Sequence, residues 1–85
     1  MEQKHWDRFR HYPTWVQHFA ESEDRPSGAL CLYRSDSDGF AWDVVYRCSD
    51  DTPREWFSLV THRDAVQRYR DMRDIIDPTG ELLIW

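Results

Sequence analysis

The side chains best suited to chemistry are the aspartates between positions 35 and 51 of this 85-residue chain. Asp36, Asp38 and Gly39 match part of a calcium-binding loop, which needs oxygen ligands at alternating positions, glycine at the sixth position and glutamate at the twelfth. If Gly39 is the sixth residue, Arg34 is the first and Val45 the twelfth, and neither supplies the required carboxylate. The aspartates therefore favour turns over a metal site.

The histidines and cysteines have no spacing that predicts a metal site or an active site. His5, His11 and His18 lie six and seven residues apart, whereas zinc ligands on a helix usually lie four apart. Cys31 and Cys48 fall inside expected strands, away from the helix N-termini and basic surroundings that activate a catalytic thiol. We expect both to be reduced thiols.

Two further patterns that occur in enzymes have a structural explanation here. The run from His62 to Asp64 matches a tripeptide of the kinase catalytic loop, but no glycine-rich loop or downstream asparagine accompanies it. Adjacent carboxylates such as Asp50 and Asp51 lie in expected loops, without the apolar walls that acid–base chemistry needs. The three glycines are dispersed and form no phosphate-binding loop. The sequence therefore predicts no enzyme, no metal and no cofactor.

The elements that must position these residues are mostly strands. Residues 40–48 alternate strictly between two faces, which is the clearest structural signal in the chain. Strands are expected over residues 29–34, 40–48 and 55–60, joined by turns at 35–39 and 49–53. Three consecutive strands with short turns predict an antiparallel meander.

Two helices and a last strand complete the prediction. Residues 5–21 have helical apolar spacing with a break at Pro13. A second helix is expected to begin after Thr61, because Thr61 can cap the first turn and Asp64 lies at the third helical position. Residues 77–80 end this helix, and residues 81–85 form a strand.

The expected fold is thus a single α+β domain over residues 1–85, with the order α-β-β-β-α-β and a four-stranded mixed sheet. The last strand should lie parallel to residues 29–34 after a right-handed crossover, which gives the strand order 3-2-1-4. The second helix should cover the face that carries Leu30, Leu32, Trp42, Val44, Phe57 and Leu59. The opposite face carries Cys31, Tyr33, Asp43, Val45, Arg47 and Trp56, and either the first helix covers it or it binds a partner.

The composition limits the classes of partner. An aromatic fraction of 15% and a hydrophobic fraction of 40% exclude a disordered chain. A net charge of -5 disfavours direct binding to nucleic acid or to an anionic membrane, and favours a protein partner with a basic surface. No apolar run matches a signal peptide or a membrane span, so we expect a cytoplasmic protein.

These observations predict a non-catalytic protein-interaction module that binds and inhibits a basic partner, such as a nucleic-acid-handling enzyme or a toxin. In size and charge the chain resembles small accessory proteins of phages and mobile elements. The residues expected to contact the partner are Trp56, Arg47, Tyr33, Asp43, Asp36, Asp38, Asp50 and Asp51. Two alternatives stay open: a homo-oligomer, such as a dimer joined through an edge strand or a sheet face, and a small-ligand binder with a pocket of Trp, Tyr and His.

Overall fold

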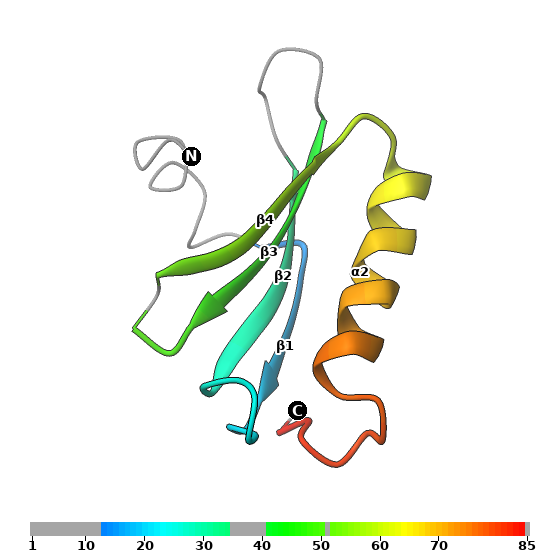
Figure 1. Ribbon diagram of the computed structural model, residues 1–85. Helices are drawn as coiled ribbons and strands as arrows, with labels where there is room; N and C mark the ends of the chain where they lie inside the picture. Colours follow the sequence, from blue (N-terminus) through cyan, green and yellow to red (C-terminus); the bar gives the residue numbers. More distant parts are fainter. Residues whose placement is uncertain (1–12, 35–40, 51, 85) are drawn as a thin grey trace.

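The computed structural model of the protein describes residues 13–34, 41–50 and 52–84. These residues form a four-stranded antiparallel sheet with the strand order β1-β2-β3-β4, and one helix, α2, lies along one face of it (Figure 1). The elements are β1 (Trp15–Phe19), β2 (Gly28–Arg34), β3 (Trp42–Cys48), β4 (Pro53–Leu59) and α2 (His62–Ile76). This part of the chain is a small α+β unit, and within it no helix has the length and apolar character needed to span a membrane.

The predicted helix over residues 5–21 is wrong where the structure describes it, because Trp15–Phe19 forms strand β1. β1 pairs antiparallel with β2 along its full length. The apolar residues Trp15, Val16 and Phe19 occupy positions i, i+1 and i+4. This spacing fits a turn of helix, but it also fits a short strand that is partly buried on both faces. Phe19 packs toward α2, whereas Val16 packs on the opposite face. Residues 5–12 of the predicted helix lie outside the described residues.

The predicted mixed sheet is also wrong, because the described strands pair only antiparallel. β1 takes the position beside β2 that was expected for the last strand. The C-terminal segment lies instead outside β1, where Leu83 forms an antiparallel bridge with Phe19. Two backbone hydrogen bonds of 2.8 Å flank this bridge, from Ile84 N to His18 O and from Ala20 N to Leu82 O. The expected order 3-2-1-4 is thus replaced by four consecutive strands, with the C-terminal segment at the edge.

The predicted alternation of β3 is confirmed, and each face of the sheet has its own apolar cluster. The face toward α2 holds the larger core, which includes Leu30, Leu32, Val44, Tyr46, Tyr69 and Met72 with Trp42, Phe57 and Leu59 packed against it. The opposite face holds Ala29, Cys31, Tyr33 and Val45, with Val16 and Trp56 packed against them. Because burial of a large apolar side chain stabilises a fold by about 1.5–3 kcal/mol, both clusters contribute to folding.

Helix α2 begins as the sequence predicts. The Oγ1 of Thr61 accepts a hydrogen bond of 3.1 Å from the backbone N–H of Asp64, which satisfies a first-turn donor. Its buried residues are Ala65, Tyr69, Met72 and Ile76, spaced by three and four positions. The hydroxyl of Tyr69 donates to the carbonyl of Leu30 on β2 at 3.3 Å, which ties the helix to the sheet.

Candidate functional site

The sheet face opposite α2 carries four of the residues predicted to contact a partner, and the structure places two of them out of reach. The side chains of Tyr33 and Asp43 are 0% exposed. Trp56 and Arg47 are half-buried. All four have further interaction partners and none is free. This face is therefore packed, and it offers no open docking surface at Tyr33 or Asp43.

Asp43 is the polar centre of that face. Its Oδ1 accepts hydrogen bonds from the indole Nε1 of Trp56 at 2.8 Å and from the Oγ of Ser58 at 2.6 Å. Both donors come from β4, the neighbour of β3, so the carboxylate joins two strands through side chains as well as through the backbone ladder. Buried carboxylates are stable only with such partners, and these contacts give Asp43 a structural role.

Of the remaining residues predicted to contact a partner, the structure describes Asp50, which is exposed in the turn between β3 and β4. Asp36, Asp38 and Asp51 lie outside the described residues.

The described residues gather acidic side chains at the end of the sheet where β1 and β3 finish. Three segments meet there: residues 20–27, the β3–β4 turn and residues 81–84 (Figure 1). The N–H of Ser49 donates to the carbonyl of Ser27 at 3.2 Å, and the N–H of Ala20 donates to that of Leu82 at 2.8 Å. We define the acidic end by the exposed carboxylates of these segments, Glu21, Glu23, Asp24, Asp50 and Glu81. The exposed Arg54 offsets this charge only in part.

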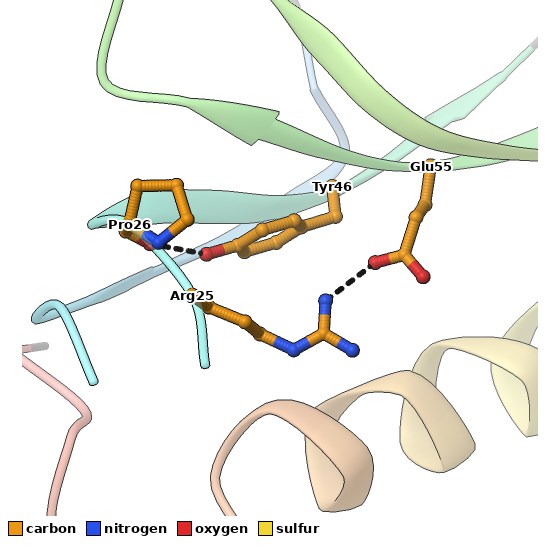
Figure 2. A network of polar contacts seen from close by, with 4 residues as sticks. All are labelled: Arg25, Pro26, Tyr46 and Glu55. Carbon is orange, nitrogen blue, oxygen red and sulfur yellow. Dashed lines mark hydrogen bonds and ion pairs between the residues drawn. The ribbon is translucent and has the colours of Figure 1, made fainter. Parts of the chain in front are cut away.

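A polar network fixes the acidic loop of residues 20–27 to the sheet (Figure 2). The Nη1 of Arg25 lies 2.7 Å from the Oε2 of Glu55 on β4. The guanidinium carbon of Arg25 lies 5.7 Å from the centre of the Tyr46 ring. The Tyr46 hydroxyl donates to the carbonyl of Pro26 at 2.9 Å. The single arginine of the loop is therefore neutralised against β4, and the neighbouring Glu23 and Asp24 remain exposed.

Asp50 and Asp77 both accept hydrogen bonds from nearby residues, but Asp50 is exposed and Asp77 is buried. Hydrogen bonds from the side chain and backbone of Thr52 lower the pKa of Asp50, so this exposed carboxylate keeps its charge in mildly acidic solution. Asp77 is buried behind the acidic end, and its Oδ2 accepts from the N–H groups of Leu82 at 3.1 Å and Leu83 at 3.0 Å. Asp77 thereby holds the C-terminal segment against β1.

Metal ions in proteins are bound by clusters of ligand side chains. Within residues 13–34, 41–50 and 52–84, no three His, Cys, Asp or Glu side chains come together as metal ligands would. Cys31 and Cys48 are not joined in a disulfide, and Cys31 is buried inside the sheet. The acidic end consists of exposed carboxylates from three segments, an arrangement that attracts positive charge.

Burial raises the pKa of both Tyr46 and Tyr69. We expect the change of Tyr46 to phenylalanine to cost about 1 kcal/mol at pH 7, because the bond to Pro26 is lost. Since the folded pKa of Tyr46 is higher than the unfolded one, its ionisation leaves stability unchanged below about pH 10 and lowers it above, and the fall should be smaller in the variant. Urea unfolding at pH 7 to 11 measures both effects. An equal alkaline loss in the two proteins would contradict the role given to Tyr46.

The Arg25–Glu55–Tyr46 network was not predicted from the sequence. Arg25 and Glu55 are 30 positions apart, and neither has a periodic signal that links them. The one available clue was an arginine beside a proline in an otherwise acidic loop, which indicates a residue held in place.

No protein-family model matches the chain, and no curated protein and no solved structure matches it.

Proposed function

We propose that the protein is a non-catalytic interaction module whose acidic end binds a basic surface on a protein partner. The observation that carries this proposal is the meeting of exposed carboxylates from three segments that are far apart in the sequence. A surface of one charge sign attracts an oppositely charged partner and raises the association rate. The network around Arg25 supports the proposal because a fixed loop loses less conformational entropy on binding than a free one.

Nucleic-acid-handling proteins and many toxins are the proposed class of partner, because a protein that binds nucleic acid has a basic surface. A small acidic protein that covers such a surface would compete with the nucleic acid and act as an inhibitor. Accessory proteins of phages and mobile elements carry out this kind of inhibition. The proposed encounter takes place in the cytoplasm, where the thiols of Cys31 and Cys48 would remain reduced.

Charge reversal at the acidic end tests the proposal. We expect Glu23→Lys with Asp24→Lys to lower the association rate with a captured partner at least tenfold, because both carboxylates are exposed and their loss removes steering. The wild-type association rate should also fall as salt increases. The measurement is surface plasmon resonance against the partner that affinity purification and mass spectrometry identify.

The matched control changes the same number of charges elsewhere. Asp64→Lys with Asp71→Lys alters two exposed carboxylates on α2, away from the acidic end, and shifts the net charge equally. Binding should survive in this control. Equal losses of association rate in the two variants would show that only the net charge matters. The proposed site would be contradicted if both variants bound the partner as the wild type does, with an association rate that does not change with salt.

A further inference from the structure

A groove of about 500 Å³ lies between the edge strand and the helix, away from the acidic end. Residues 14–17 form one wall, and Tyr69, Arg70 and Arg73 of α2 form the other. Trp15 is 40% exposed although it is a large aromatic residue, and its ring lies edge-on to Tyr69 with 5.3 Å between the ring centres. The lining of the groove is thus partly aromatic, and solvent reaches the ring of Trp15.

The outer edge of β1 supplies backbone groups that can pair with another strand. The carbonyl of His18 points outward, because it accepts from the N–H of Ile84 in the C-terminal segment. Backbone groups alternate in direction along a strand, so Val16, two residues earlier, presents its N–H and carbonyl to the same side. Among the described residues no hydrogen bond joins these two groups of Val16. The bridge of Leu83 with Phe19 shows that this edge accepts an antiparallel strand, and the described part of the C-terminal segment reaches Ile84, opposite His18.

The charge of the groove indicates which strand would fit. Arg70 and Arg73 lie one helical turn apart, and none of the described residues that line the groove is a carboxylate. Arg73 forms a long, exposed ion pair with Asp74, with 3.9 Å between Nε and Oδ1, and such a pair offsets its charge only weakly. The groove is therefore a local basic site on an acidic protein. A second copy of the chain paired through the same edge would bring its own Arg70 and Arg73 to the interface, and like charges would oppose it.

We infer that the edge of β1 and this groove form a second binding site, which takes an extended acidic segment of a partner protein as an added β-strand. The backbone of the segment pairs with Val16. Every second side chain points to the α2 face, where its carbon chain lies against Trp15 and Tyr69 and its carboxylate contacts Arg70 or Arg73. This site is separate from the acidic end and has the opposite charge.

The experiment uses three labelled eight-residue peptides and fluorescence polarisation. The first alternates glutamate and valine, the second alternates lysine and valine, and the third is the glutamate peptide with alternate backbone nitrogens methylated. The glutamate peptide should bind at least tenfold more tightly than either of the others, because lysine reverses the charge and methylation removes the donors that pair with β1. Equal binding of the glutamate and lysine peptides, or no loss on methylation, would overturn the inference.

Variants of the protein locate the site. Arg70→Glu with Arg73→Glu should weaken the glutamate peptide at least tenfold, whereas Arg63→Glu, exposed in the first turn of the same helix, should leave its affinity unchanged. The acidic-end variant Glu23→Lys with Asp24→Lys should bind the peptide at least as tightly as wild type, so failure at one site is distinguishable from failure at the other. Unchanged affinity in the Arg70 and Arg73 variant would overturn the inference. So would sedimentation that shows a dimer lost on Arg70→Glu with Arg73→Glu, because a second copy would then occupy the groove.

Discussion

The substitution Gly28→Ala should destabilise the protein by about 3 kcal/mol, which is a large fraction of the free energy of unfolding of a domain of this size. Gly28 begins β2 and is buried opposite Cys48 of β3. A β-carbon at this position would collide with the backbone carbonyl oxygen of Arg47 and would lie 3.0 Å from the Tyr46 hydroxyl. A backbone atom in a paired strand cannot rotate away as a side chain can, so β2 and β3 must separate locally.

The same change should also loosen the acidic end, because the ring of Tyr46 lies over Gly28 and carries the hydrogen bond to Pro26. The melting temperature should fall by about 15 °C. The measurements are thermal and urea unfolding, together with hydrogen exchange of residues 20–27. The matched control is Gly80→Ala, where a β-carbon meets open space and the cost is only the φ of 78°, about 1 kcal/mol. Equal losses at the two glycines would contradict the steric argument.

The parts of the fold that sequence reasoning predicted correctly each carry a signal of their own. β3 alternates between two faces over its whole length, and α2 has both a capping threonine and a regular apolar stripe. β1 has no such signal. Its five residues are too few to separate a period of two from a period of 3.6, and both of its faces are partly buried. Assigning it to a helix then left the position beside β2 open, and the last strand was wrongly placed there.

The candidate site shows a similar limit. The identity of the acidic residues is visible in the sequence, but their meeting at one end depends on β1 being a strand that returns the chain to β2. The ion pair of Arg25 with Glu55 depends on the same topology. For the opposite face, alternation correctly separated Asp43 and Tyr33 from the helix-facing core, yet it could not tell a packed second face from an exposed one. Burial on both faces of a sheet is set by the rest of the chain, and the local pattern is the same in either case.

Replacement of Asp43 by alanine should destabilise the protein by about 3 kcal/mol, because the indole N–H of Trp56 and the hydroxyl of Ser58 lose a shared charged acceptor. Ser58→Ala removes one donor and leaves the carboxylate bonded to Trp56, so it should cost about 1 kcal/mol. Asp43→Asn keeps an acceptor oxygen but lacks the charge, and its stability should lie between these two. Urea unfolding of the three variants measures the order.

The order of these stabilities also decides whether Asp43 acts in folding or in binding. A carboxylate that is 0% exposed cannot reach a partner, so any loss of binding in Asp43→Ala should follow the loss of folded protein and disappear when binding is corrected for it. Burial of a charge has a desolvation cost that hydrogen bonds must exceed for the residue to stabilise the fold. If Asp43→Ala were as stable as the wild type and failed to bind the partner, the sheet face opposite α2 would have to open on binding, and the interface would include it.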